Sequence, residues 1–346
     1  MKRNLFLFSG ILALSLTANA QELKEEYMTW PNSQGLGEYA SQWTPGEYLF
    51  EDENFYISRV KPKARFRNAN TQINETLTEE TDKNLVFWVP IGTASGGNPN
   101  ARPNGKFDSE VFSMWSYVTH YGNWTAPQGW VPGGFADAAH KNGVGVSGVA
   151  SIPWGSLSSD WATALDNMSK NATIREKVAK FLHYHGVDGL GYNSEFNTSN
   201  TTMLSNVRAL NEEVHKYLTE QGNPVAENFW YDGRNDNGQI NFDQGLGSHN
   251  NETFGDGEHI RTSLFLNYNW WGTPLSTFNT GTINSQAPGR SLLDLYAGFN
   301  MQGGDPSTWT LLEDYNVSIG LWGAHDFNML WADRANYGRN SWVIKM

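Results

Sequence analysis

Apolar residues fall along the chain in short runs of the length expected for strands that are buried on both faces. The clearest run is 85–91 (LVFWVPI), and a weaker one lies near 115–121 (WSYVTHY). Further runs predict strands at 144–150, 187–195, 225–231, 263–268, 295–299 and 317–322. The pattern therefore predicts eight strands in all.

Helical patterns separate several of these strands. Residues 134–141 (GFADAAHK) indicate a helix that stops at the following Asn-Gly pair. In the next helix, Thr173 and Glu176 have the spacing of a capping box, and Gly186 ends the helix. Its apolar residues recur at i, i+4, i+7 and i+8, namely Ile174, Val178, Phe181 and Leu182. A later helix carries one apolar stripe, formed by Met203, Val207, Leu210, Val214 and Tyr217.

Strands that alternate with helices build parallel βα units. Eight such units in about 260 residues are typical of a closed barrel, so we predict an α/β protein with a (β/α)8 TIM barrel over residues 83–346. The polar, proline-interrupted residues 21–82 are expected to form a lead-in segment that packs on this barrel. Residues 1–20 combine a basic start, an apolar run and a final Ala-Asn-Ala, which predicts a signal peptide cleaved after Ala20. We therefore expect a secreted or periplasmic protein.

Charge and composition exclude several functions. The 346-residue chain has 36 acidic and 24 basic residues, a net charge of −12, which argues against a nucleic-acid binder. The absence of cysteine excludes disulfides, thiolate metal sites and cysteine nucleophiles. The sequence carries no metal-binding or phosphate-cradling motif and no apolar run of transmembrane length. We expect neither a cofactor nor membrane insertion.

The end of the fourth predicted strand carries the most informative side chains. Active sites of such barrels lie at the C-terminal ends of the strands. Because side chains alternate along a strand, Asn193 and Glu195 point the same way, roughly 6.6 Å apart along the chain. Gly189 and Gly191 share this face and leave space beside it. The alternative is that Asn193 caps the following helix and Glu195 is a solvated loop acid.

A carboxylic acid beside an amide suits one type of glycoside hydrolysis. A sugar with a 2-acetamido group supplies its own nucleophile, because the carbonyl oxygen of the acetamide attacks the anomeric carbon. Glu195 then suits the general acid/base, and we expect a partly buried pocket to raise its pKa. Asn193 suits the group that orients the acetamide N–H, since an amide oxygen accepts such a bond. Glu227 and Asp232 offer other carboxylates, but Asp232 is expected to hold the turn that follows it.

Two short motifs frame this strand end. Asp188-Gly189 precedes Asn193-Ser194-Glu195, and this arrangement resembles the D-G and N-x-E of the fourth strand in glycoside hydrolase family 85, the endo-β-N-acetylglucosaminidases. Other stretches similar to the family are Trp115 to Tyr117, Gly133 to Gly148, Phe229 to Asp232, Asn267 to Trp271 and Ile319 to Asp326. The similarity thus extends along most of the predicted barrel.

The resemblance implies a role for each matching residue. Asn193 would orient the acetamide, and Glu195 would be the acid/base. The substrate-binding residues would be Tyr231 near the acetamide, Asp188 from the D-G motif, and Trp270 or Trp271 lining the sugar site. Most of the 15 tryptophans, Trp88 among them, are expected in the core, whereas Trp322 lies near a strand end that should face the sugar.

By this resemblance we expect an enzyme that hydrolyses the GlcNAc-β-1,4-GlcNAc core of N-glycans with retention of configuration through an oxazoline. Its partner would be an N-glycan or a glycoprotein. A chitinase-like hydrolase of family 18 type is one alternative, although Gly191 and Asn193 replace the two inner aspartates of its D-G-x-D-x-D-x-E strand. A glycan-binding barrel that has lost catalysis is the other.

Overall fold

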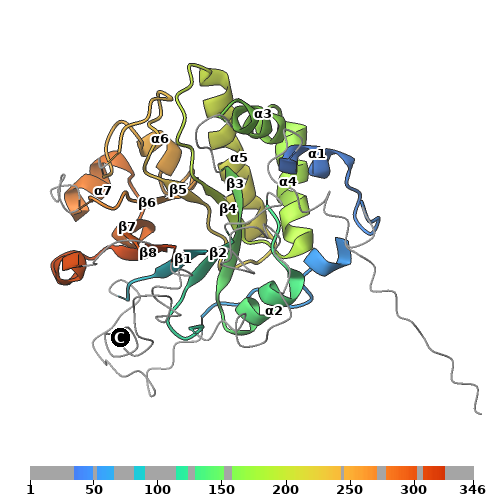
Figure 1. Cartoon of the computed structure of the whole chain (residues 1–346), viewed down its shortest axis with the longest axis horizontal. Helices are drawn as coiled ribbons and strands as arrows, with labels where there is room; N and C mark the ends of the chain where they lie inside the picture. The colour runs from blue at the N-terminus through green and yellow to red at the C-terminus, as the bar shows by residue number, and fades with distance from the viewer. Residues whose placement is uncertain are drawn as a thin grey trace, which may run out of the picture.

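A computed structural model describes residues 35–49, 53–65, 82–89, 114–123, 129–151, 158–242, 245–270, 278–301 and 307–323 of the chain. Within them, parallel strands close into a barrel in the order of the sequence (Figure 1). The strands are β1 (Leu85–Val89), β2 (His120–Asn123), β3 (Gly145–Ser151), β4 (Gly189–Tyr192), β5 (Phe229–Tyr231), β6 (Ser263–Phe265), β7 (Leu295–Asn300) and β8 (Ser318–Trp322). Because β1 pairs with both β2 and β8, the sheet has no edge. The predicted (β/α)8 barrel is confirmed.

The second strand differs most from its prediction. It begins at His120, whereas residues 115–117 form a turn that Tyr117 N closes by donating to Met114 O (3.0 Å). Tyr117 in this turn is 67% exposed. The strand itself, HYGN, is polar in sequence and yet buried at every position. Its polar groups therefore face partners inside the protein, and hydropathy alone misplaced the strand.

Helices surround the barrel unevenly. They are α1 (Gly35–Gln42), α2 (Gly133–Lys141), α3 (Ser158–Ser169), α4 (Ala172–His185), α5 (Thr201–Glu220), α6 (Asn251–Phe254) and α7 (Thr280–Gln286), with short 3-10 helices η2 (Glu53–Tyr56), η6 (Leu292–Asp294) and η7 (Ser307–Glu313). The sequence pattern did not predict α1 or α3. Among the residues of α3 whose burial is described, the buried apolar ones are Ala164, Leu165 and Met168, a stripe too short to give a clear periodicity.

The two ends of α4 test the predicted caps. The helix begins at Ala172, and the side-chain oxygen of Asn171 accepts from Ile174 N (3.0 Å). The proposed capping box of Thr173 and Glu176 is therefore wrong, because Thr173 already lies inside the helix. Gly186 ends α4 with φ of 73°, a left-handed conformation that glycine adopts without strain, as predicted.

The described part of the expected lead-in segment lies on the outside of the barrel helices. Figure 1 shows α1 against α3 and α4. Trp43 packs edge-on against Phe181 of α4, with ring centroids 5.6 Å apart. The expected signal peptide, residues 1–20, lies outside the described residues. No helix in the ranges given above is long and apolar enough to cross a membrane.

Two buried histidine–carboxylate pairs hold this segment and β4 in place. His185 Nε2 lies 2.9 Å from Glu53, and His140 Nε2 lies 2.9 Å from Asp188. The other ring nitrogen of His140 faces Val60 O at 2.7 Å, so both nitrogens of this ring meet acceptors. Burial alone would lower the pKa of His140, but the hydrogen bond and the charge of Asp188 outweigh it and raise the pKa. His140 thus joins the segment to β4, and its two acceptors favour the protonated ring.

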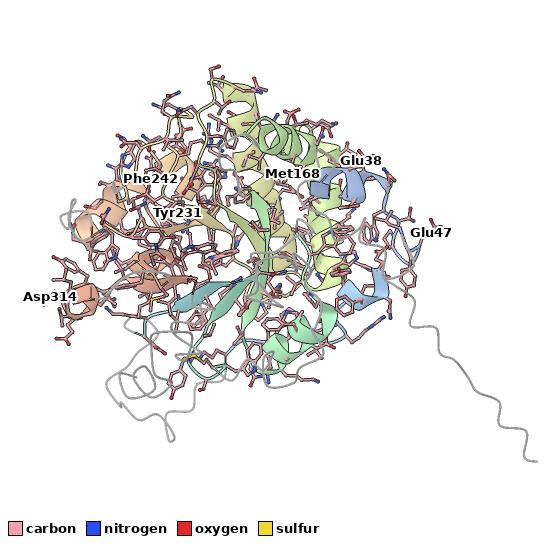
Figure 2. The ribbon with its side chains drawn as sticks, viewed as in Figure 1. Glu38, Glu47, Met168, Tyr231, Phe242 and Asp314 are labelled. Atoms are coloured by element: carbon pink, nitrogen blue, oxygen red, sulfur yellow. The ribbon has the colours of Figure 1, made fainter. Side chains whose placement is uncertain are left out.

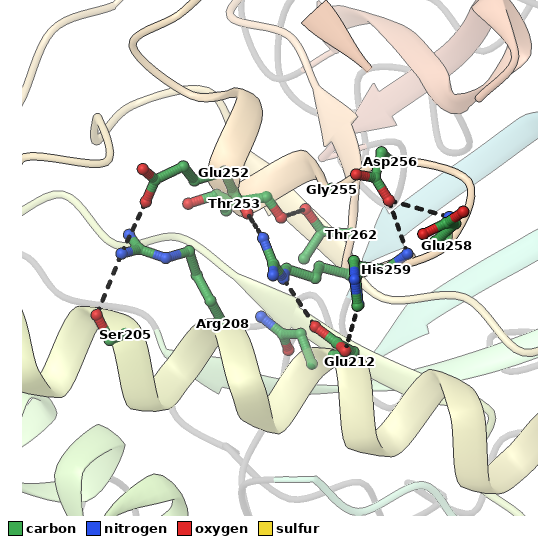
Figure 3. Close-up of polar contacts among 12 residues, drawn as sticks. Ser205, Arg208, Glu212, Glu252, Thr253, Gly255, Asp256, Glu258, His259 and Thr262 are labelled. Atoms are coloured by element: carbon green, nitrogen blue, oxygen red, sulfur yellow. Dashed lines mark hydrogen bonds and ion pairs between the residues drawn. The ribbon is translucent and has the colours of Figure 1, made fainter. Parts of the chain in front are cut away.

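Surface ion pairs join α5 to the connection that follows β5 (Figure 3). Arg208 lies 2.9 Å from Glu252 of α6. Glu212 pairs with Arg261 at 3.1 Å and with His259 at 2.8 Å. Exposed pairs of this kind contribute little stability one by one, so the network mainly fixes where this connection lies.

A polar layer fills the barrel interior near the start of the strands. His120 Nε2 donates to Ser147 Oγ (2.6 Å), which donates to Glu227 O (3.1 Å). The Glu227 carboxyl accepts from Ser263 Oγ (2.6 Å) and from the Tyr296 hydroxyl (2.8 Å). Burial lowers the pKa of His120 to about 3 and raises the pKa of Glu227 to about 7. This layer is therefore largely uncharged in mildly acidic solution.

Asp188→Asn should destabilise the protein, because it leaves the buried His140 without its anionic partner. We expect a loss of about 3 kcal/mol in the free energy of unfolding, measured by urea denaturation. His140 has a raised pKa in the folded state, so the stability due to this pair is present below about pH 6.5 and is lost as the pH rises through that raised pKa. The difference in the free energy of unfolding between wild type and variant should therefore become smaller at alkaline pH. Equal stability of the two proteins, or a difference that grows at alkaline pH, would contradict the role of this pair. Asp314→Asn on the surface is the matched control.

Glu227→Gln should remove a pH dependence of stability. The folded protein keeps the Glu227 proton up to about pH 7, whereas the ordinary pKa is 4.5. Wild-type stability should therefore fall as the pH rises from about 4.5 to 7, by on the order of 3 kcal/mol, and the variant should lack this slope. Urea unfolding across this window measures it, with Glu220→Gln at the exposed end of α5 as control. Parallel slopes for wild type and Glu227→Gln would refute the assignment.

Candidate active site

A cavity of about 240 Å³ opens at the C-terminal ends of the barrel strands. Its lining comes from the ends of β1, β4, β5, β6 and β8 and the residues that follow them: Trp88, Tyr192, Asn193, Glu195, Phe229, Tyr231, Phe265, Tyr268 and Trp322. This is the end at which (β/α)8 barrels carry their active sites. The lining is aromatic except for one carboxyl and one amide.

The floor of the cavity is an aromatic cluster inside the barrel. Trp88 packs edge-on against Phe229 with ring centroids 5.6 Å apart, and both belong to the same buried cluster as Phe265. A methyl group on Gly191 or Gly122 would overlap the Trp88 indole. The expected space beside Gly191 is therefore real, and the Trp88 ring fills it. Trp88 is buried, as predicted, but its ring also lines the cavity.

Asn193 and Glu195 both line the cavity, just beyond β4. Burial raises the pKa of Glu195, and a hydrogen bond from the Asn193 side chain partly offsets this, which confirms the expected upward shift. Asn193 does not cap the next helix, because Asn200 caps α5 by accepting from Met203 N (3.0 Å). The alternative reading of the two residues is therefore wrong for Asn193, and the half-buried Glu195 is not a fully solvated acid.

Tyr231 stands opposite this pair at the end of β5. Its hydroxyl oxygen accepts from Asn267 Nδ2 at 2.7 Å. Burial raises the pKa of Tyr231, and the nearby charge of Glu195 adds to the shift, so the phenol keeps its proton. Figure 2 shows Tyr231 beside Phe242, whose side chain is 37% exposed, with ring centroids 6.1 Å apart. A protonated phenol thus lies near the carboxyl, and a partly exposed aromatic ring packs beside that phenol.

The segment after Glu195 is held by the loop that follows β5. Thr198 N donates to Gly238 O (2.9 Å), and Ile240 N donates to the side chain of Asn197 (2.8 Å). The buried guanidinium of Arg234 lies 4.4 Å from the Phe196 ring centroid, a cation–π contact. These contacts restrain the backbone next to the carboxyl. Sequence reasoning did not identify them, because they join residues that are far apart in the chain.

Of the residues expected to bind substrate, Tyr231 lines the cavity, whereas Trp270 and Asp188 do not. Trp270 is buried outside the barrel, where its Nε1 donates to Gly298 O (3.2 Å) and its ring packs against Phe278. It does not line the cavity, because the chain turns after β6. Trp271 lies outside the described residues. Asp188 faces outward from β4, where it also accepts from Val146 N (2.7 Å).

Other aromatic residues take the place of Trp270 in the cavity. Trp322, expected near the sugar, lines it at the end of β8. Phe265 and Tyr268 line it from β6 and the turn that follows, and sequence reasoning did not single them out. The available signal was position, since Phe265 ends a strand and Tyr268 lies three residues beyond it.

Among the described residues, Glu195 is the only carboxylate that lines the cavity. Glu227 lies in the polar layer at the opposite end of β5, and does not pair with Glu195. Asp232 accepts from Gly245 N (3.3 Å) and from Asn250 Nδ2 (3.2 Å), so it holds the turn, as predicted. Within the described residues no group of three or more His, Asp or Glu side chains could bind a metal ion. The chemistry that this lining supports is proton transfer by one acid beside an amide and a phenol.

Solved structures of three proteins resemble this chain to different degrees. The glycoside hydrolase domain of Endo-D from Streptococcus pneumoniae R6 matches with a TM-score of 0.67 and 22% identity, over 85% of this chain. This chain spans 46% of that domain's length. A chitinase from Bacteroides thetaiotaomicron has 12% identity over 74% of this chain and 80% of its own, with a TM-score of 0.39. A family 18 chitinase from Cycas revoluta has 14% identity over 63% and 68%, with a TM-score of 0.36.

The likeness to the Endo-D domain shows a shared fold. A comparison with curated proteins gave no match. The model of glycosyl hydrolase family 85 matches residues 97–341, which include the strands from β2 to β8 and the cavity residues that they carry. The match covers more than half of the chain, so this protein belongs to glycosyl hydrolase family 85.

Proposed function

We propose that this protein is an endo-β-N-acetylglucosaminidase that cleaves the GlcNAc-β-1,4-GlcNAc core of N-glycans, carried free or on glycoproteins. The observation that carries the proposal is Glu195, a half-buried acid with a raised pKa that shares the cavity with the Asn193 amide. Membership of family 85 and the fold shared with the Endo-D domain support it.

The proposed reaction uses the acetamide of the substrate as nucleophile. Its carbonyl oxygen attacks the anomeric carbon while the Glu195 carboxyl gives its proton to the glycosidic oxygen, and the bond between that oxygen and the anomeric carbon breaks. The oxygen of Asn193 accepts from the acetamide N–H and stabilises the positive oxazolinium. Water then attacks the anomeric carbon, Glu195 takes a proton from it, and the oxazoline ring opens. Two inversions at one carbon give retention.

The aromatic lining fits a sugar substrate. The rings of Trp88, Phe265 and Trp322 offer flat apolar faces to the C–H groups of a pyranose. With one carboxylate in the described lining, the two-carboxylate scheme of ordinary glycosidases has no second partner there. The net charge of −12 offers no affinity for nucleic acid. Export is a further part of the proposal, and the signal-like sequence of residues 1–20 supports it.

Glu195→Gln should reduce kcat on a high-mannose glycopeptide by about 10³-fold, because the amide cannot give a proton to the leaving oxygen. In the wild type, kcat should fall as the pH rises through the raised pKa of Glu195, since the acid form is then lost. Mass spectrometry of the released glycan measures turnover, and Glu176→Gln on the exposed face of α4 is the control. Unchanged turnover in Glu195→Gln would refute the assignment.

Faster cleavage of chitin oligomers than of glycopeptide would favour a chitinase, and binding without product would favour a glycan-binding barrel.

Asn193→Ala should lower kcat by about 10²-fold and change KM much less. The contact between the amide oxygen and the acetamide N–H strengthens as the oxazolinium gains positive charge, so its loss is felt mainly in the transition state. Steady-state kinetics on the same glycopeptide separate the two parameters. Asn206→Ala on α5, remote from the cavity, is the matched control. A rise in KM at constant kcat would instead assign Asn193 to ground-state binding.

A further inference from the structure

Arg234 is a buried cation in the loop that follows β5. Its side chain is 1% exposed, and none of its nitrogens Nε, Nη1 and Nη2 has a hydrogen-bond partner among the described residues. Burial lowers the pKa of Arg234 to about 9, so the guanidinium is still charged at neutral pH. A buried charge without a polar partner lowers the stability of a fold, because its hydration is lost and not replaced. The presence of this arginine therefore calls for a reason other than stability.

Two aromatic rings supply the contacts of this guanidinium. Its Cζ lies 4.4 Å from the ring centroid of Phe196 and 5.2 Å from that of Trp230. Trp230 Nε1 also donates to Arg234 O (3.2 Å), which holds the backbone of the arginine beside the same ring. Cation–π attraction is strongest at desolvated sites, and a planar guanidinium stacks on a ring face in a defined orientation. Arg234 therefore fixes the Phe196 ring more closely than a flexible apolar side chain would.

Phe196 directly follows Glu195 in the chain, and the loop that carries Arg234 also contacts the residues beyond it. Thr198 N donates to Gly238 O (2.9 Å). A methyl group on Gly238 would lie 2.2 Å from Thr198 O, so the loop and this segment are in close contact. Of these contacts, the one between Arg234 and Phe196 is the nearest in the chain to the carboxyl.

The loop is itself anchored to the helix that follows it. Arg234 pairs with Ile240 in an antiparallel bridge, so the loop folds back on itself as a hairpin. Near its tip, the Asp236 carboxylate accepts from Glu252 N (2.9 Å) and Thr253 N (3.0 Å) in α6. The hairpin therefore gives the Phe196 ring a support that is fixed independently of β4.

We propose that Arg234 is a positioning residue for Glu195. Its guanidinium fixes the Phe196 ring, and thereby the backbone that carries the neighbouring carboxyl, at the expense of the stability of the fold. The inference rests on the proposed function, because Glu195 is the acid of that reaction. Removal of the cation should change activity and stability in opposite directions, whereas loss of a side chain with only a structural role would change both in the same direction.

Arg234→Met tests this inference with a side chain of similar length and no charge. Tm should rise by a few degrees, because an apolar group that packs on the same two rings replaces the buried cation. On the high-mannose glycopeptide kcat should fall by about 10²-fold, the effect that a displacement of about 1 Å near a reacting group can have, with KM nearly unchanged. Hydrogen exchange followed by mass spectrometry should become several-fold faster at residues 193–198.

Phe196→Leu removes the other partner of the contact. It should lower kcat to a similar extent but also lower Tm, because a buried ring is lost. The double variant Arg234→Met/Phe196→Leu should lose no more kcat than either single variant, since all three lack the same contact. The matched control is Arg290→Met at the opposite end of the barrel, where the guanidinium lies 4.0 Å from the Phe254 ring centroid but also donates to Thr262 O (3.0 Å). This control should lower Tm and leave kcat unchanged.

Three outcomes would overturn the inference. They are unchanged kcat and exchange in Arg234→Met, parallel losses of Tm and kcat in that variant, and additive losses of kcat in the double variant. A wild-type protein that leaves the glycopeptide uncut would overturn the proposed function instead. The exchange and Tm measurements need no substrate, so they would still decide whether Arg234 holds the segment that carries Glu195.

Discussion

Closure of the barrel around the Trp88 indole is the constraint on which the site depends. The ring needs glycine at both Gly122 and Gly191, because any side chain there would occupy the same space. The ring packs against Phe229, and both rings line the cavity. Glu195 therefore sits above an apolar surface, and this raises its pKa. Packing inside the barrel thus favours the protonated form of this carboxyl.

Side chains along β4 and the residues next to it point alternately into the barrel and outward to the helices. Gly191, Asn193 and Glu195 face the barrel axis and the cavity. Asp188 and Tyr192 direct their polar groups outward, to His140 and to Asn211 of α5, with distances of 2.9 and 2.7 Å. The outward polar groups hold the strand against its helices, and Asn193 and Glu195 line the cavity. A change at Asp188 can therefore impair activity without contact between this residue and the substrate.

Sequence alone predicted the barrel and the position of Asn193 and Glu195 on one face at the end of β4, because apolar runs and parity act locally. It failed where position depends on the folded context. The polar β2 is buried through partners that hydropathy ignores, and Trp270 turns outward because the chain leaves the sheet soon after Phe265. Asp188, assigned to the substrate by its motif, is bound by His140 instead. Asn267 and Tyr268 gain importance only beside Tyr231, which lies more than thirty residues earlier in the chain.

The pair of Glu53 and His185 has a consequence for how the chain folds. These residues lie 132 positions apart, and both are buried only in the finished structure. Glu53 leaves the ribosome long before its partner exists, so its carboxylate stays hydrated while α4 is still being made. Joining such distant residues incurs loop-closure entropy before any contact compensates for it. The segment of residues 35–65 is therefore the first of the described parts to be synthesised and among the last to acquire its native contacts.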